Sequence, residues 1–192
     1  MVFWLALLCP VLSTSLAGFS LPSLTLANAM QSREVPREYQ LKAIYLYNFL
    51  NFVYWPLEKC DPPGVMPREI AVIGHSPFGD ALQALKHKLH KAGTPLDVIY
   101  LGSYHKGMDL SGCRLLFVCD SEKQNFETII ASVAGKPVLT VGDSEEFVEA
   151  GGMITLISRQ NKVRWIINRM HTREAGLQMK AKLLDIAVKV VE

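Results

Sequence analysis

Short apolar runs alternate with stretches of helical apolar spacing along most of the chain. The runs that predict strands are Glu69–Gly74, Leu96–Leu101, Arg114–Cys119 and Pro137–Val141. Between them, the spacing predicts helices over Phe78–Lys91, Glu122–Ala134 and Ser144–Glu149. A run that is apolar throughout, such as residues 115–118, is typical of a strand buried on both faces of a parallel sheet. The alternation therefore indicates βαβ crossovers with helices on both faces of one sheet.

The first predicted helix, Tyr39–Trp55, is apolar on more than one side and is ended by Pro56. One side carries Leu41, Ile44, Tyr45, Phe49 and Phe52, and the opposite side carries Leu46, Tyr47, Leu50 and Tyr54. A helix that is apolar all round must be covered on more than one side. Either it packs between the sheet and another helix of the same chain, or a partner subunit covers it.

The C-terminal part departs from this alternation. Met153–Ser158 and Lys162–Asn168 predict two strands joined by the polar turn at residues 159–161, and so short a connection permits only an antiparallel hairpin. A stripe of Leu177, Ala181, Leu184, Val188 and Val191 predicts a last helix over Glu174–Val191. The fold class expected is α/β, a three-layer sandwich with a mostly parallel twisted sheet and a C-terminal antiparallel hairpin.

The N-terminus reads as a signal peptide over residues 1–29, followed by one domain over residues 30–192. An apolar stretch broken by Pro10 leads to Ala27-Asn28-Ala29, which is a small-x-small cleavage site. A membrane-spanning helix needs about 20 uninterrupted apolar residues, so the stretch is expected to be a leader without a direct membrane anchor. Export is the expectation.

Charge and composition narrow the class of function. The formal net charge is +2 at pH 7, and 49% of the residues are apolar. The near balance of charge argues against nucleic acid as a partner, and the apolar content allows a sizeable core. Three cysteines follow the leader, Cys60, Cys113 and Cys119, so one disulfide at most forms within a monomer.

No catalytic set, cofactor motif or metal site is expected. The loops after the strands, where open α/β sheets bind ligands, hold Gly74–Asp80, Asp120 and Asp143-Ser144. Ser76 is better explained as a helix cap before Pro77, and Asp120 and Asp143 or Ser144 as caps of the helices that follow. His87 and His90 lie among lysines that would repel a metal ion.

Several segments together resemble the YfiR family, in the family's order and over nearly all of the chain after the leader. They are Leu41-Lys42-Ala43, Tyr47-Asn48-Phe49, Trp55-Pro56, Ile73-Gly74, Pro77-Phe78-Gly79-Asp80, Gly112-Cys113-Arg114-Leu115-Leu116-Phe117, Leu139-Thr140-Val141-Gly142-Asp143 and Gly151-Gly152-Met153-Ile154. The resemblance implies a periplasmic, usually dimeric protein without catalysis. It would bind the periplasmic part of an inner-membrane diguanylate cyclase, hold the enzyme inactive, and so lower cyclic-di-GMP signalling and biofilm formation.

The cysteines depart from the pattern of that family, in which a cysteine stands where this chain has Ala71. Cys60 precedes the first strand of the sheet and Cys113 precedes the third. If those strands are neighbours, both thiols lie at the same end of the sheet, and a Cys60–Cys113 disulfide is the bridge expected.

Two regions are candidates for a partner or dimer surface. The hairpin offers Arg164 and Trp165, residue types that are favoured anchors at interfaces, although Trp165 could equally pack under the last helix. The first helix offers Tyr45, Tyr47 and Tyr54. A rival hypothesis is a periplasmic small-ligand-binding protein that feeds a sensor kinase or transporter through the loops near His75 and His105.

Overall fold

One mixed sheet of seven strands forms the centre of the computed structural model of the chain, which describes residues 35–56, 68–160 and 162–192. Its strands are β2 (Glu69–Ile73), β3 (Asp97–Gly102), β4 (Leu115–Val118), β5 (Leu139–Gly142), β6 (Ile154–Arg159), β7 (Lys162–Asn168) and β9 (Lys189–Val191). They lie in the order β3-β2-β4-β5-β6-β7-β9. Neighbouring strands run parallel except β6 and β7, which form the predicted antiparallel hairpin. The predicted fold class is confirmed.

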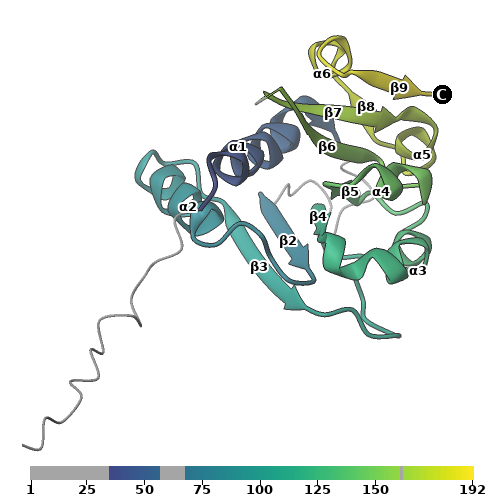
Figure 1. Ribbon diagram of the computed structural model, residues 1–192, viewed down its shortest axis with the longest axis horizontal. Coiled ribbons are helices and arrows are strands. Elements are labelled where there is room, and N and C mark those ends of the chain that lie inside the picture. The colour runs from purple at the N-terminus through teal and green to yellow at the C-terminus, as the bar shows by residue number, and fades with distance from the viewer. Residues whose placement is uncertain (1–34, 57–67, 161) are drawn as a thin grey trace, which may run out of the picture. The chain divides into compact units, whose positions relative to one another are not determined.

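Helices cover both faces of the sheet (Figure 1). They are α1 (Arg37–Phe52), α2 (Ala81–Lys91), α3 (Phe126–Ser132), α4 (Glu145–Glu149), α5 (Arg169–Glu174) and α6 (Ala181–Asp185). On β4, Leu115 and Phe117 point into a core shared with α1 and α2, whereas Leu116 and Val118 point into a second core shared with α3. Burial of alternate residues on opposite faces is why this strand is apolar at every position.

The first helix ends earlier than its apolar pattern predicts. α1 stops at Phe52, and Val53–Tyr54 form the short strand β1, which pairs with β8 (Gln178–Met179) in a separate two-stranded sheet. The backbone N–H of Lys180 donates to the Phe52 carbonyl at 2.9 Å. This contact with the distant C-terminal segment satisfies a carbonyl that a longer helix would leave without a donor, because Pro56, four residues on, has no N–H.

The helices that follow β2 and β4 are also shorter than predicted. α2 begins at Ala81 after a turn, where the Ser76 hydroxyl accepts a hydrogen bond from the Phe78 N–H at 3.4 Å. After β4, a 3-10 helix spans Asp120–Asn125 before α3, and Glu122 between its ends has non-helical backbone angles. Asp120 lies within that helix and does not cap it, so its predicted capping role is wrong.

The predicted last helix, Glu174–Val191, is wrong. α5 ends before Gly176, whose φ of +74° suits glycine, and the Leu177 N–H donates back to the Thr172 carbonyl at 2.8 Å. The chain then forms β8, α6 and β9, and β9 pairs with β7 in parallel. The apolar residues whose spacing predicts one helix are therefore divided among several short elements and the segments that join them.

Candidate functional site

The loops at the carboxyl ends of β2 and β4 are tied to each other. The backbone N–H of His75 donates to the Ser121 hydroxyl at 2.8 Å. Gly74 has a φ of +95°, and a Cβ there would lie 2.6 Å from the same hydroxyl. The buried Glu122 carboxylate accepts from the backbone N–H of Tyr104 at 3.2 Å. These polar groups hold the loops in place, whereas the His75 and His105 side chains are exposed.

A buried polar cluster lies after β5, where Asp143 meets two residues of α1. The Asp143 Oδ2 accepts from the Tyr39 hydroxyl at 2.9 Å and lies 3.3 Å from the Lys42 ammonium. The side chains of Lys42 and Asp143 are only 3% and 6% exposed. Lys42 also pairs with Glu38 at 2.7 Å. Of the two residues expected as caps, Ser144 takes the N-cap position of α4, whereas Asp143 joins α1 to the end of the sheet.

Titration of this cluster favours a structural role. Burial, together with the Asp143 carboxylate, raises the pKa of Tyr39 well above its ordinary value, so the hydroxyl keeps its proton and donates it. Partial burial raises the pKa of Glu38, but hydrogen bonds from Lys42 and Ser158 and the charge of Lys42 outweigh it and leave that pKa below its ordinary value. Tyr39 and Glu38 are thus each held in the protonation state that its contact requires.

Cys119, which follows β4, is a protonated thiol at neutral pH. Burial, followed by the charges of Asp143 and Glu122, raises its pKa to about 12. A thiol whose pKa is raised in this way is a poor nucleophile. We therefore assign Cys119 to the core.

This shift predicts a loss of stability at alkaline pH. The unfolded thiol ionises near its ordinary pKa of 9.0, whereas the folded thiol holds its proton to about pH 12. The contribution is therefore complete below pH 9 and is lost as pH rises toward 12. Above pH 9, the free energy of unfolding of a Cys119→Ala variant should therefore fall less steeply with pH than that of the wild type. The difference in slope is up to about 1.4 kcal/mol per pH unit. Urea titrations across this range measure the slope. Val118→Ala, a buried change without a titrating group, should keep the wild-type slope, and an equal slope in Cys119→Ala would contradict the assignment.

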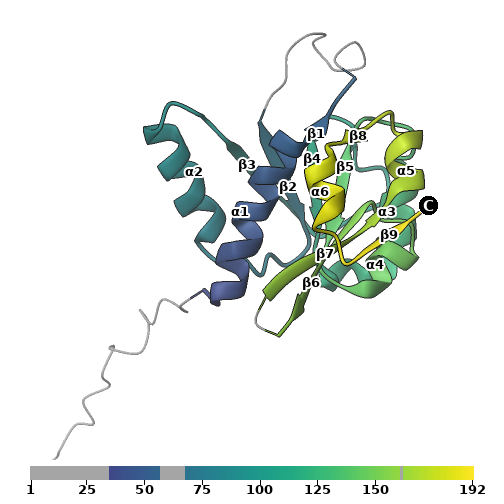
Figure 2. The ribbon, with the colours of Figure 1, turned by 90° about the horizontal axis from the view of Figure 1, so that it is seen from above.

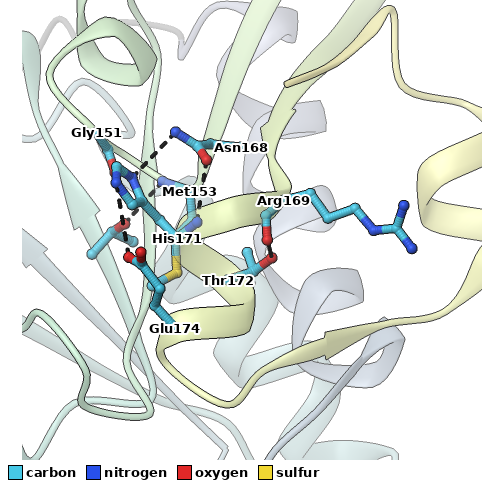
Figure 3. Close-up of polar contacts among 8 residues, drawn as sticks. Gly151, Met153, Asn168, Arg169, His171, Thr172 and Glu174 are labelled. Atoms are coloured by element: carbon cyan, nitrogen blue, oxygen red, sulfur yellow. Dashed lines mark hydrogen bonds and ion pairs between the residues drawn. The ribbon is translucent and has the colours of Figure 1, made fainter. Parts of the chain in front are cut away.

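A second polar cluster surrounds His171 in α5 (Figure 3). Its Nδ1 lies 2.6 Å from the Gly151 carbonyl oxygen and 3.2 Å from the Asn168 side-chain nitrogen. The Asn168 side chain accepts from the His171 backbone N–H at 3.2 Å and caps α5. His171 Nε2 lies 4.0 Å from Glu174. The cluster fastens α5 to the loop that follows α4.

Sequence reasoning missed this cluster because it placed the start of the last helix at Glu174. Asn168 closes an apolar run, and asparagine is among the favoured residues at a helix N-cap. That signal could have placed a helix start before His171. The φ of +101° at Gly151, and the 2.8 Å that would separate a Cβ there from the His171 ring, explain the first glycine of the Gly151-Gly152 pair.

An apolar groove lies between α1 and α2, which lie side by side (Figures 1 and 2). It has a volume of about 590 Å³. Its lining consists of Val35, Gln40, Ile44, Tyr47 and Asn48 from the first-helix region, and Asp80, Ala81, Ala84, Leu85, Lys88 and Leu89 from the second. Ile44 is 45% exposed there. The groove thus leaves part of α1 uncovered, as expected for a helix that is apolar on more than one side.

The groove differs in charge from one end to the other. Val35 packs against Gly79 beside Asp80, so the N-terminal ends of the two helices meet at the end that carries this carboxylate. Lys88 lines the other end. There Arg68 donates to the Tyr47 hydroxyl at 2.9 Å. The apolar floor therefore runs from an acidic end to a basic end.

The predicted aromatic residues of the first helix fall in three places. Tyr47 lines the groove. Tyr45 is half-buried, with its ring 5.2 Å from that of Trp165. Tyr54 is 57% exposed in β1 and lines a different cavity, of about 200 Å³, together with Arg68 and Lys180. The three tyrosines do not form one surface.

The hairpin candidates are separated by the pleat of β7. Trp165 is only 4% exposed, and its indole N–H donates to the Leu183 carbonyl at 3.0 Å. It lies in the core against α1 and α6, where a partner does not reach its ring. Arg164 points to the opposite face of the sheet and is half-buried.

The expected Cys60–Cys113 disulfide stays a prediction, because Cys60 lies outside the described residues. β2 and β4 are neighbours, as the prediction assumed. Cys113 is half-buried and bonds to no cysteine among the residues that the structure describes, and burial raises the pKa of its thiol to about 11. Within the three described ranges, no group of three histidine, cysteine, aspartate or glutamate side chains could hold a metal ion. The same ranges contain no helix with the length and apolar character that a membrane crossing requires.

Comparison with protein families gives a match that covers most of the chain. The profile of the YfiR/HmsC-like family matches residues 39–188. No curated protein matches the chain.

Two solved structures share the fold at low sequence identity. One is the ABC domain in complex with L-Trp from Streptococcus pneumoniae, with a TM-score of 0.51 and 14% identity over 76% of this chain and 60% of that chain. The other is a conserved domain protein from Vibrio cholerae, with a TM-score of 0.51 and 12% identity over 79% of this chain and 60% of that chain. This chain thus spans about 60% of their length. At such identities the likeness concerns the fold alone.

Proposed function

The chain belongs to the YfiR/HmsC-like family, and from that premise we propose that it is a periplasmic protein that binds and inhibits an inner-membrane diguanylate cyclase. At the level of the family, this is a periplasmic regulator of diguanylate cyclase activity. The proposal adds the direction of the effect. While bound, the chain lowers cyclic-di-GMP output and biofilm formation, and its release raises both.

Inhibition of this kind requires binding and no chemistry by the chain itself. A cyclase with active and inactive conformations shifts toward the inactive one when a partner binds that conformation more tightly. The shift is limited by the difference in affinity for the two conformations. A preformed surface that recognises the inactive conformation is therefore sufficient.

The observation that carries the proposal is the groove between α1 and α2. Its floor exposes apolar side chains, among them Ile44 at 45% exposure, between two helices that already lie in place. Exposed apolar surface rimmed by polar groups is typical of interaction sites. By contrast, the polar clusters around Asp143 and His171 are engaged in contacts within the chain.

Export and assembly complete the proposal. The leader over residues 1–29 directs the chain to the periplasm and is removed after Ala29, and the domain over residues 30–192 acts there as a homodimer. N-terminal sequencing of the exported protein tests the cleavage, and light scattering of the purified domain tests the dimer.

Replacing Ile44 by aspartate tests the use of the groove. A charge on its floor would have to be desolvated under a partner, so the affinity for the periplasmic domain of the cyclase is expected to fall at least about tenfold. Calorimetry with that purified domain measures the affinity, and cyclic-di-GMP levels in cells report the loss of inhibition.

A matched control is Ile186→Asp, which makes the same change at a residue that is 42% exposed and lies outside the groove lining. Its affinity should stay within about twofold of the wild type, a difference below 0.5 kcal/mol. Loss of binding in Ile186→Asp but not in Ile44→Asp would move the interface to the C-terminal part. Ligand-dependent stabilisation without any cyclase binding would favour the small-ligand hypothesis.

A further inference from the structure

We propose that the occupant of the groove between α1 and α2 is an amphipathic helix of the partner, with acidic side chains at the end of the groove that carries Lys88. This inference rests on the proposed function, because it names the chemistry of the segment that the cyclase would present.

The shape of the groove fits a helix. Its two walls are helices of 16 and 11 residues, and both begin at the same end of the groove, where Val35 packs against Gly79. At a rise of 1.5 Å per residue the shorter wall is about 16 Å long, so it could contact about three turns of a third helix. Its apolar floor suits the stripe of an amphipathic helix, which is a recurring mode of recognition.

The charge on α2 selects for carboxylates. This helix carries Lys86, Lys88 and Lys91 and no aspartate or glutamate. Lys88 lines the groove, and Lys91 lies three residues further on, on the same face of the helix. Lys86 is paired with Asp97 at 3.2 Å. Among the residues that the structure describes, no carboxylate pairs with Lys88 or Lys91, so these two cations remain available to a partner.

The charges at the two ends of the groove determine where the acidic side chains of a bound helix can lie. Asp80 lines the end where the helices begin, and Lys88 lines the end where they approach their C-termini. A helix with acidic residues along its whole length would place one of them against Asp80, and like charges in contact cost affinity. Acidic side chains confined to the Lys88 end avoid that repulsion.

A second copy of the chain fits this groove less well. It presents the same hollow, so two copies that meet through their grooves would leave both floors without a ridge to fill them. Close packing across an interface needs complementary shapes. A protruding helix from a different protein supplies the ridge.

Two synthetic helices of about three turns test the inference. Both carry the same leucine and alanine stripe, and one end carries glutamates in the first and lysines in the second. Fluorescence anisotropy with the folded domain should give an affinity at least about tenfold higher for the glutamate helix at low salt, and this preference should shrink as salt rises.

Charge reversal on α2 locates the contact. Lys88→Glu should remove the preference for the glutamate helix, whereas Lys86→Glu, the same change on the face of α2 away from the groove lining, should leave it in place. Equal affinity for both helices, or a preference that survives Lys88→Glu, would overturn the inference.

Binding of the cyclase domain distinguishes a failure of the inference from a failure of the proposed function. If Ile44→Asp abolishes its binding while Lys88→Glu does not, the acidic occupant is wrong and the proposed function stands. If Lys88→Glu and Lys86→Glu behave as expected with the synthetic helices but the cyclase domain does not bind the wild-type chain, the proposed function fails and the groove chemistry stands.

Discussion

Replacing Trp165 by alanine is expected to lower the free energy of unfolding by about 4 kcal/mol. The ring is almost fully buried between β7, α1 and α6, and it meets the rings of Tyr45 and Phe49 edge-on at 5.2 and 5.5 Å. Truncation removes this apolar contact area and leaves a cavity. It also leaves the Leu183 carbonyl without its indole donor. A loss of this size is a large share of the stability of a domain, so the variant should unfold at a much lower urea concentration.

This result separates a core residue from an interface anchor. Arg164, its neighbour on β7, faces the other side of the sheet, so Arg164→Ala is expected to change the free energy of unfolding by less than about 1 kcal/mol. Urea unfolding followed by circular dichroism compares the two variants. A Trp165→Ala protein with wild-type stability and weakened partner binding would contradict the core assignment and restore the interface interpretation.

The sheet could be predicted from sequence because its signal is local. In β4, both faces are buried, so every residue from Leu115 to Val118 is apolar, and no helix pattern competes with that run. The hairpin of β6 and β7 was equally clear, since the polar turn is too short for any other connection. These features depend on residues close together in the chain.

The C-terminal segment shows where local pattern fails. Spacing from Leu177 to Val191 matched a helix, yet β8 pairs with β1 and β9 pairs with β7, and neither partner is near in sequence. Val188, Val190 and Val191 are β-branched and favour strands, while Gly176 favours a helix end. The helical spacing predicts a helix in spite of these preferences. The pairing with strands distant in sequence decides in favour of strands.

The candidate site could be predicted only in part. Tyr47, a candidate for a partner or dimer contact, lines the groove, and its contact with a partner stays a prediction. The groove itself depends on how α2 packs against α1, and the local pattern of residues does not predict that packing. The ligand-binding loops expected from the fold class are fastened by contacts such as that between His75 and Ser121. Asp143 was expected only in a loop after a strand and as a possible helix cap, because its partner Lys42 lies 101 residues away in the sequence.

Replacing Lys42 by methionine is the second large change expected, with a loss of about 3 kcal/mol in the free energy of unfolding. Removing one member of a buried ion pair leaves the other charge in a low-dielectric environment, and such changes cost about 3–5 kcal/mol. The value is placed at the lower end because the Tyr39 hydroxyl still donates to Asp143. Methionine keeps most of the volume and the apolar stem of lysine, so packing alone does not explain a loss of this size.

The control variant is Lys86→Met, which breaks the exposed pair with Asp97. Exposed pairs contribute at most about 1 kcal/mol, so this variant should stay close to wild type in the same urea titrations. A double-mutant cycle with Asp143→Leu then isolates the coupling. If the cost of Lys42→Met arises from a stranded carboxylate, it should largely disappear once that carboxylate is gone, so the double variant should be more stable than the sum of the single losses implies. Additive losses would mean that Lys42 stabilises α1 through its contact with Glu38 and through packing, and that Asp143 holds the end of the sheet on its own.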